Sequence, residues 1–470
     1  MAHRLNATLL GTVMAAALGG SLLGFDTAII SGATHSLSRV FNLSPGELGL
    51  TVSAALWGTV AGALGAGVLG RRFGGRTSLM ILAACYLVSA LGCAVSHSWI
   101  SLLHFRFVGG LGMGGSSVIA PVYIAEVAPS TWRGRLVGAF QVNIIGGILL
   151  AYLSNYVIGS FPLGEVEWRW QLGIAAVPAA LFLMTLLGIP QSVRWLAARG
   201  RLDEAKGVLL RLGSPADSEL AAILKSLDEN AGPNAQRLFQ RTHRRPILLA
   251  IMLAMFNQLI GINAVLYYLN DIFAMAGFDR TSQNAQAIVV GAVMLVATLV
   301  ALSIIDRLGR RTLLLVGSVG LAVCLTGIAA IFYTRQHQDL LLVLLIGYIA
   351  FFAFSQGAVI WVYLSEIFPV RVRSQGQSLG SSTHWVMNAL VSIAFPIIAA
   401  RSQTGPFVAF LAIAILQFFA VLLFFPETSG VSLEDMQRRF DVGRQEAGKV
   451  KMTTRSDAVP KGTSSVSPDA

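Results

Sequence analysis

Charged side chains are scarce in this sequence. Asp, Glu, Lys and Arg together make up 12% of its 470 residues, whereas apolar residues make up 55% and the mean hydropathy is +0.68. A soluble domain carries roughly 25% charged residues. A chain with so little charge cannot cover its surface with polar groups. The composition therefore excludes an ordinary soluble domain and indicates that a lipid bilayer surrounds most of the chain.

The sequence also has few residues that carry out chemistry. Its three cysteines, Cys85, Cys93 and Cys324, lie in apolar stretches and form neither a disulfide framework nor a metal-binding spacing. Its seven histidines are scattered, and it contains no G-x-x-x-x-G-K-[ST] phosphate loop. We therefore expect no metal, no cofactor and no enzyme activity, and the missing phosphate loop argues against an ATP-driven pump.

Twelve apolar segments are long enough to cross a bilayer, which takes roughly 20 residues. The first begins like a signal peptide, but its apolar run continues past Asp26 to Ile30, so we interpret it as a retained helix. None of the segments alternates between apolar and polar residues as the strands of a membrane barrel do. The sequence therefore predicts an all-α membrane protein with 12 transmembrane helices. Their approximate ranges are 8–32, 46–70, 77–97, 101–125, 136–159, 170–190, 246–273, 285–305, 312–334, 340–364, 376–399 and 405–425.

The arginines of the loops predict the orientation of these helices. Four loops on one side carry ten arginines: Arg71, Arg72, Arg76, Arg133, Arg135, Arg307, Arg310, Arg311, Arg371 and Arg373. The loops on the opposite side carry five: Arg39, Arg169, Arg280, Arg335 and Arg401. Because cytoplasmic loops are enriched in Lys and Arg, we expect both termini in the cytoplasm. The formal net charge of +11 then reflects topology, and we expect no nucleic-acid partner.

A polar stretch, residues 197–244, separates the sixth and seventh segments. Apolar residues recur in it at helical spacing, for example Leu202, Ala205 and Val208. We expect short helices that lie against the cytoplasmic face. Residues 438–470 are polar and rich in Ser and Thr, so they are predicted to be a disordered cytoplasmic tail.

The chain repeats itself. Glu126, in EVAPSTWR, returns as Glu366, in EIFPVRVR. RRFGGR likewise returns as DRLGRR, and PQS returns as PET. Motifs that return at nearly the same spacing indicate a duplicated unit of six helices. We therefore expect two pseudo-symmetric halves, residues 1–196 and 245–437, related by an axis along the membrane normal.

These motifs are similar to those of the sugar porter family of the major facilitator superfamily. The similar segments include GFDTAIISG, FRFVGGLGMGG, FQVNIIGGIL, PQSVRWL, NQLIGINAVLYY, GAVIWVYLSEIFPVRVR and PETSGVSLED, and they extend from about residue 20 to residue 437. The fifth helix looks most like that of bacterial galactose and arabinose proton symporters. The resemblance implies the major facilitator fold, with two halves that rock around a central site near the bilayer midplane.

An acidic residue, Asp26, lies inside the first apolar segment, and Arg106 lies inside the fourth. A charged group at the bilayer centre costs roughly 2.5–3.5 kcal/mol on insertion scales, so such a carboxylate usually has a function. Burial favours the neutral carboxyl and a neighbouring guanidinium favours the charged one. A movement that makes or breaks the pair would therefore load or release a proton. The resemblance implies that Asp26 carries the proton and Arg106 tunes it; a static ion pair between two helices is the alternative.

A sugar site needs groups that both donate and accept hydrogen bonds, as Asn and Gln do, together with flat apolar surfaces. By resemblance, the sugar-binding residues are Gln141, Asn257, Gln258, Asn263, Tyr268, Trp361, His384 and Trp385, and the outer gate is formed by Tyr267 and Tyr268. The alternative for each amide is a hydrogen bond between helices. His384 stands where Asn or Gln is common, and Met294 replaces a usual Asn, so the identity of the sugar stays open.

The resemblance also implies a cytoplasmic latch that closes the inner side when the protein faces outward. In it, Glu126 pairs with Arg373 and Glu366 with Arg133, and Asp306 and Arg310 belong to the same group. Ordinary surface ion pairs, worth roughly 0–1 kcal/mol, are the alternative. Three departures from the family pattern bear on these motifs: Arg71 stands at the place of Asp306 in the first half, Gln191 replaces a Glu, and Ala358 replaces a Pro whose loss is expected to reduce the kink of the tenth helix.

The sequence thus favours a sugar:proton symporter that imports a hexose or a pentose across the cell membrane. A facilitative sugar or polyol uniporter, a sugar sensor without transport and a carrier of a non-sugar solute are the alternatives. Asp26 and Arg106 argue against the uniporter, and the short tail argues against the sensor. We expect a monosaccharide, a proton and the lipid bilayer as partners, and a monomeric protein.

Overall fold

The structure of the chain is a computed structural model that describes residues 6–129, 132–230, 238–369 and 372–429. Within these ranges every regular element is a helix. The prediction of an all-α protein is thus confirmed, whereas the predicted tail, residues 438–470, lies outside the described residues.

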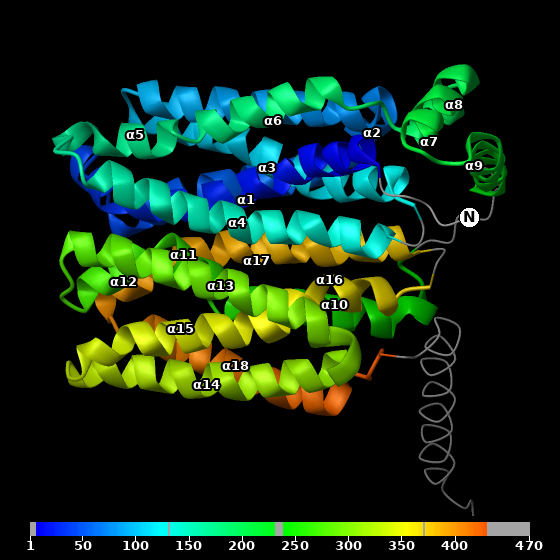
Figure 1. Ribbon diagram of the computed structural model, residues 1–470. Coiled ribbons are helices and arrows are strands. Elements are labelled where there is room, and N and C mark those ends of the chain that lie inside the picture. The colour runs from blue at the N-terminus through cyan, green and yellow to red at the C-terminus, as the bar shows by residue number, and fades with distance from the viewer. Residues whose placement is uncertain (1–5, 130–131, 231–237, 370–371, 430–470) are drawn as a thin grey trace, which may run out of the picture.

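Two bundles of helices lie side by side (Figure 1). The first consists of α1 (Ala7–Val40), α2 (Pro45–Val95), α3 (Trp99–Val127), α4 (Arg133–Gly159), α5 (Glu167–Gly173) and α6 (Ala176–Gly188). The second consists of α10 (Arg244–Leu259), α11 (Ile262–Tyr267), α12 (Leu269–Met275), α13 (Arg280–Leu308), α14 (Arg310–Thr334), α15 (Leu341–Phe352), η4 (Ala353–Gly357), α16 (Ala358–Glu366), α17 (Arg373–Arg401) and α18 (Gly405–Phe424). We call these bundles the first and second halves.

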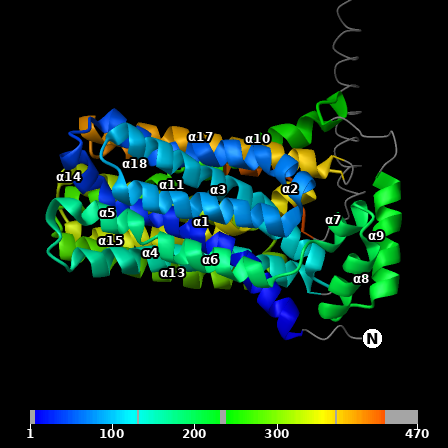
Figure 2. The same cartoon turned by 90° about the horizontal axis from the view of Figure 1, so that it is seen from above.

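Three short helices connect the halves: α7 (Val193–Ala198), α8 (Leu202–Arg211) and α9 (Ala216–Asn230). They lie together at one end of the bundles (Figures 1 and 2), which we call the linker end; the opposite end is the far end. In α8, the residues at helical spacing, Ala205, Val208 and Leu209, are buried, as expected of an amphipathic helix.

The helices account for twelve membrane crossings. Among the described residues, 11 helical stretches are long and apolar enough to cross a membrane. One of them, α2, has 51 residues and would be about 75 Å long if straight, more than twice the hydrocarbon core. It turns back at Gly74, whose φ of +77° glycine adopts without strain. α2 therefore crosses twice, which gives the twelve crossings predicted.

The repeat in the sequence is also a repeat of contacts. Gly309, with a φ of +83°, makes the turn between α13 and α14 that Gly74 makes within α2. The hydroxyl of Tyr123 donates to the backbone carbonyl of Pro190 over 2.6 Å. In the second half, Tyr363 donates to the carbonyl of Pro426 over 3.1 Å. The two halves therefore fold their repeated motifs in the same way.

Three helices that the sequence predicts as continuous are interrupted, and one of them, 170–190, is divided into α5 and α6. The predicted helix 246–273 is broken at Gly261, which has a φ of +94°, and again at Tyr268. The predicted helix 340–364 contains a π-helical turn, η4, although Ala358 replaces the proline that would kink it. Neither of these two interruptions changes the hydropathy of its segment, so a hydropathy pattern does not reveal it. Turns of this kind are frequent at functional sites.

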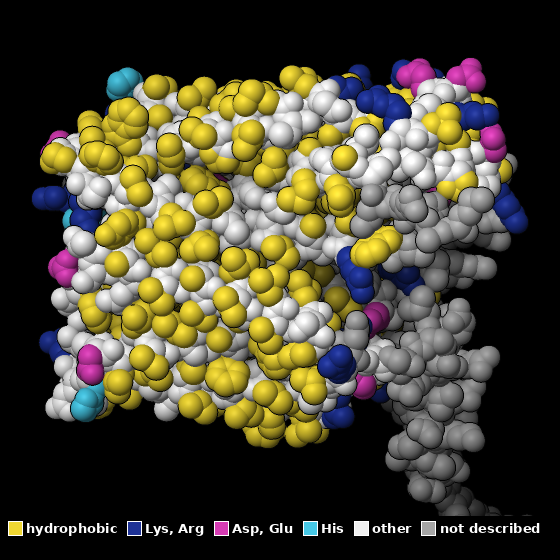
Figure 3. Space-filling view, in the orientation of Figure 1, with side chains coloured by type: hydrophobic (Ala, Val, Ile, Leu, Met, Phe, Trp, Pro, Cys, Tyr) yellow, Lys and Arg dark blue, Asp and Glu magenta, His cyan; other side chains and the backbone are white. Residues whose placement is uncertain are grey.

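The surface of the bundles is suited to lipid. Hydrophobic side chains are spread along the length of the helices, whereas charged side chains gather at the two ends (Figure 3). Large apolar side chains on this surface are widely exposed, among them Val323 at 65% and Leu423 at 70%. Only a bilayer can cover so much apolar surface, so the structure is that of a membrane-spanning protein.

Glycines set the position of α1 against α4. A Cβ at Gly24 would lie 1.8 Å from the backbone oxygen of Ile144, and one at Gly147 would lie 2.0 Å from that of Ser21. The two backbones thus approach as closely as helices can, which is how membrane helices pack through small residues. This contact holds the segment of α1 that carries Asp26.

Candidate functional site

Asp26 and Arg106 meet inside the first half, as the sequence predicts. Arg106 Nη1 lies 3.5 Å from Asp26 Oδ1. The Arg106 side chain is 4% exposed and the Asp26 side chain is 22% exposed. The Arg106 Nε donates to the backbone oxygen of Thr51 over 3.2 Å, so the guanidinium joins α1, α2 and α3. The cation is fixed in the protein, while the carboxylate is partly exposed.

A chain of polar side chains links α10, α11 and α17 in the second half. Gln258 Nε2 donates to Asn257 Oδ1 over 2.8 Å and lies 3.2 Å from the ring nitrogens of His384. Asn263 Nδ2 donates to Gln258 Oε1 over 2.9 Å. Asn257 Nδ2 in turn donates to the backbone oxygen of Gln356 in η4 over 3.3 Å. The break at Gly261 lets Gln258 and Asn263 face each other; we call Asn257, Gln258, Asn263 and His384 the amide cluster.

Two tryptophans flank the amide cluster. The ring centroids of Trp361 and His384 are 5.2 Å apart, and those of His384 and Trp385 are 5.1 Å apart. Trp385 is buried, whereas the Trp361 side chain is 39% exposed. An exposed indole beside groups that donate and accept hydrogen bonds is the combination that binds the apolar face and the hydroxyls of a sugar.

Two other residues bear on the same site. Gln141 lies on α4, in the first half, and its side chain is partly exposed. Met294, on α13, is 7% exposed and belongs to the hydrophobic core, so the wall that it forms is apolar, as expected from the sequence. The predicted sugar-binding residues that contact one another through polar groups therefore all belong to the second half.

The predicted gate residues are packed at the far end. Tyr267 is 3% exposed, and its hydroxyl accepts a hydrogen bond from Asn388 Nδ2 over 3.1 Å. Tyr268 is 1% exposed, donates to the backbone oxygen of Ser392 over 2.9 Å and stacks on Phe395. The sequence did not single out Asn388, although a polar residue one helical turn after His384 in an apolar helix was a usable signal.

Direct bonds between the halves lie toward the far end. The Tyr152 hydroxyl of α4 donates to the backbone oxygen of Leu266 in α11 over 3.2 Å. Glu167 of α5 forms an ion pair with Arg280 of α13 and accepts a second hydrogen bond from Gln171 over 2.9 Å. The Thr27 and Thr34 hydroxyls of α1 also lie within hydrogen-bonding reach of Tyr267 in α11 and of Asp271 in α12. The structure is therefore closed at the far end.

The predicted latch residues are only partly described. Glu126 accepts a hydrogen bond from the Ser192 hydroxyl, and Glu366 pairs with Arg310 over 2.9 Å. The side chains of Arg133 and Asp306 lie outside the described residues. Arg373 Nε and Nη2 are buried without a hydrogen-bond partner among the described residues, so Arg373 does not pair with Glu126 here. The latch is expected in the state whose linker end is closed, and here the far end is closed instead. The pairs Glu126–Arg373 and Glu366–Arg133 therefore stay predictions.

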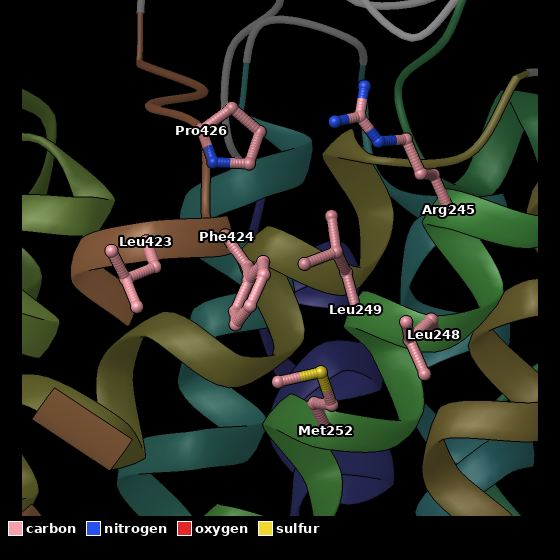
Figure 4. A pocket seen from close by; sticks show the side chains of 7 residues that line it. All are labelled: Arg245, Leu248, Leu249, Met252, Leu423, Phe424 and Pro426. Atoms are coloured by element: carbon pink, nitrogen blue, oxygen red, sulfur yellow. The ribbon is translucent and has the colours of Figure 1, made fainter. Parts of the chain in front are cut away.

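A cavity of about 230 Å³ lies away from these residues, between the beginning of α10 and the end of α18. Arg245 and Pro426 stand at one side of it, and Leu249, Met252 and Phe424 are among the apolar side chains that line the rest (Figure 4). It contains none of the predicted sugar-binding residues, and one arginine among apolar groups does not suit a polyhydroxylated ligand.

Comparison with known proteins identifies the family. The family described as "Sugar (and other) transporter" matches residues 12–440. The chain is 36% identical to the arabinose-proton symporter of Bacillus subtilis (strain 168), over 90% of this chain and 93% of that protein. It is 34% identical to the D-xylose-proton symporter of Escherichia coli (strain K12), over 90% of this chain and 94% of that protein.

Solved structures of the xylose transporter XylE from E. coli have the same fold. An inward open conformation gives a TM-score of 0.83 at 32% identity and covers 92% of this chain and 99% of that chain. The complex of XylE with 6-bromo-6-deoxy-D-glucose gives a TM-score of 0.77 at 33% identity, with the same coverage. Sequence and fold agree, and the chain belongs to the sugar porter family of the major facilitator superfamily.

Proposed function

We propose that this protein is a secondary active transporter that imports a monosaccharide together with a proton by alternating access. The observation that carries the proposal is the Asp26–Arg106 pair, in which a buried guanidinium holds a partly exposed carboxylate within the membrane-spanning bundle. A uniporter needs no such group. Curated relatives with about 35% identity are named arabinose- and xylose-proton symporters, which supports the same reading.

The linker end is proposed to face the cytoplasm of the cell, with both termini there. The support is the excess of loop arginines at this end. In this orientation the structure faces inward, because its far end is closed. The similarity to the inward open conformation of XylE, with a TM-score of 0.83, supports this proposal. The working unit is taken to be one chain, with halves at 1–196 and 245–437 joined by 197–244.

The amide cluster and Trp361 are proposed to bind the sugar. The donor and acceptor groups of Asn263 and Gln258 would exchange their mutual hydrogen bond for bonds to sugar hydroxyls. Trp361, the exposed ring, would cover an apolar face of the sugar. Gln141, contributed by α4 of the first half, would complete the site, so that a bound sugar draws the two halves together.

The proton step follows from the position of Asp26. When the carboxylate pairs with Arg106 it is stabilised as the charged form, and when the pair loosens in the low-dielectric interior the neutral form gains. A conformational change that alters the 3.5 Å separation therefore changes the affinity for a proton. Sugar binding and proton binding are then coupled because both act on the same movement of the halves.

The test is sugar uptake into proteoliposomes that contain the purified full-length chain. Radiolabelled arabinose, xylose, glucose and galactose are offered with and without an inward pH gradient. We expect accumulation of at least one sugar only with the gradient, and alkalinisation of the external medium on sugar addition. Equilibration without accumulation would indicate a uniporter. Binding of a sugar without any uptake would indicate a sensor, and no binding of any sugar would point to another solute.

A further inference from the structure

Asp271 is a second carboxylate that the proposed mechanism does not use, and it is partly exposed as a residue. It lies on α12, at the far end, where this short helix of the second half packs against α1 of the first half. Its Oδ2 atom is buried and has no hydrogen-bond partner among the described residues. The oxygen is thus enclosed between two halves that must separate during transport. A buried acceptor without a hydrogen bond costs free energy, so it is unusual in a closed interface.

The hydroxyl group beside Asp271 can satisfy a charged carboxylate only in part. Thr34, on α1, is 1% exposed, and its side chain is the hydrogen-bonding group next to the Asp271 carboxyl. The Thr34 hydroxyl has a single proton and lies 3.2 Å from the backbone oxygen of Ser31. This single proton goes either to Ser31 or to one oxygen of the Asp271 carboxyl. In either arrangement Asp271 Oδ2 has no hydrogen-bond donor among the described residues.

No positive charge compensates Asp271. Among the described residues, no Lys, Arg or His nitrogen lies within 4.0 Å of its carboxyl. Arg280, on the adjacent α13, is paired with Glu167, and His35 and Arg39 of α1 are exposed. The titratable side chain that faces Asp271 is Tyr268, whose hydroxyl donates elsewhere. A buried carboxylate without a partner binds a proton rather than remain charged.

We propose that Asp271 is a protonation site that controls closure of the far end: the halves close over its neutral form, and its ionisation holds them apart. The inference rests on the alternating access proposed above. Opening of the far end separates α12 from α1 and brings the carboxyl into the external solution. Because the carboxyl reaches the external solution only when the far end is open, its proton reports the external pH to the gate, whereas the proton delivered with the sugar is assigned to Asp26.

The direction of the pH effect follows from proton binding. The closed far end holds a proton on Asp271, and the open far end releases it once the external pH exceeds the range of an ordinary carboxyl group. The state that binds the proton is favoured at low pH. Closure is therefore expected to weaken as the pH rises, by up to about tenfold in the closed-to-open ratio for each pH unit while one proton is released.

The experiment measures the far end directly, without sugar and without transport. Spin labels are placed on cysteines introduced at two exposed far-end positions, Val40 and Ala274, after the three native cysteines are replaced. The distance between the labels is recorded by pulsed electron resonance in nanodiscs from pH 5 to pH 9. The full chain is used throughout. The Asp26→Asn variant serves as background, so that titration of Asp26 does not contribute.

We expect the short, closed distance to lose population with rising pH in the background variant and to persist at every pH once Asp271→Asn is added. Asp339→Asn, which removes another acidic side chain exposed at the far end, is the matched control and should leave the pH dependence in place. A pH dependence that survives Asp271→Asn overturns the proposal, as does a pH-independent background, or an Asp271→Asn variant that is open at every pH. None of these results bears on sugar accumulation, so failure here is distinguishable from failure of the proposed function.

Discussion

The ion pair between Glu167 and Arg280 offers an asymmetric perturbation of the far end. The Glu167 side chain is 2% exposed, whereas that of Arg280 is 54% exposed. Replacing Arg280 by Gln leaves a buried carboxylate without its cation. Replacing Glu167 by Gln leaves only a cation that water already reaches. The first variant is therefore expected to disturb the closed state far more than the second, although both remove the same ion pair.

The magnitudes follow from this difference in burial. Removing one partner of a buried pair costs about 3–5 kcal/mol. Glu167 keeps the hydrogen bond from Gln171, and opening of the far end returns it to water, so we expect a cost of about 2–3 kcal/mol for Arg280→Gln. That is roughly a 30- to 150-fold shift toward the open far end, since 1.36 kcal/mol is a factor of ten. In Glu167→Gln the attraction to Arg280 is lost, but a charged carboxylate no longer has to be removed from water when the far end closes. The expected change in the free energy of closure is about 0–1 kcal/mol.

The assay is the label distance between positions 40 and 274 at one fixed pH, for both single variants and the double variant. The double variant should resemble Glu167→Gln, because removing the buried charge also removes the reason for the cost of Arg280→Gln. Arg335→Gln, which removes an exposed far-end arginine, serves as the control. Equal effects of the two single variants, or additive effects in the double variant, would refute the argument from burial.

Three further predictions concern transport itself. Asp26→Asn should abolish proton-driven accumulation while sugar exchange between equal pools continues; accumulation that persists in proteoliposomes would remove Asp26 from the proton step. Gln258→Ala should raise the KM for sugar roughly 10- to 100-fold, because a neutral hydrogen-bonding group is lost from an enclosed site. Gln417→Ala, at a buried glutamine of α18 that donates to Ser318 of α14, should leave KM unchanged. Arg373→Ala should shift the population toward the inward-facing state, and unchanged outside accessibility of an engineered cysteine would contradict the latch.

The fold could be predicted because its signals are repeated and strong. Each crossing is a long apolar segment, and the two halves repeat the same motifs, so errors of a few residues at helix ends do not alter the architecture. The turn at Gly74 separates two segments that hydropathy also separates. The breaks at Gly261 and in η4 were not predicted, because they depend on backbone geometry within apolar runs.

The candidate site could be predicted only in part. An acidic residue in an apolar helix is conspicuous by itself, so Asp26 could be identified as a candidate without reference to any family. The residues of the amide cluster were selected by resemblance, since single amides in membrane helices usually serve packing. Glu167 and Arg280 were not paired, because they are far apart in sequence and belong to different halves. A sequence that must support several conformations does not indicate which contacts belong to which one.

The repeated loops show which part of a shared motif the fold needs. In the second half, Glu427 accepts hydrogen bonds from the backbone nitrogens of Arg310 and Arg311 over 2.8 and 3.0 Å. In the first half its place is taken by Gln191, whose side-chain oxygen accepts from the backbone nitrogen of Arg76 over 3.0 Å. The charge has been lost and the contact has been kept, because an amide oxygen accepts a hydrogen bond as a carboxylate does. This position therefore serves to hold the loop, and a charge-dependent latch has to be carried by other residues of the motif.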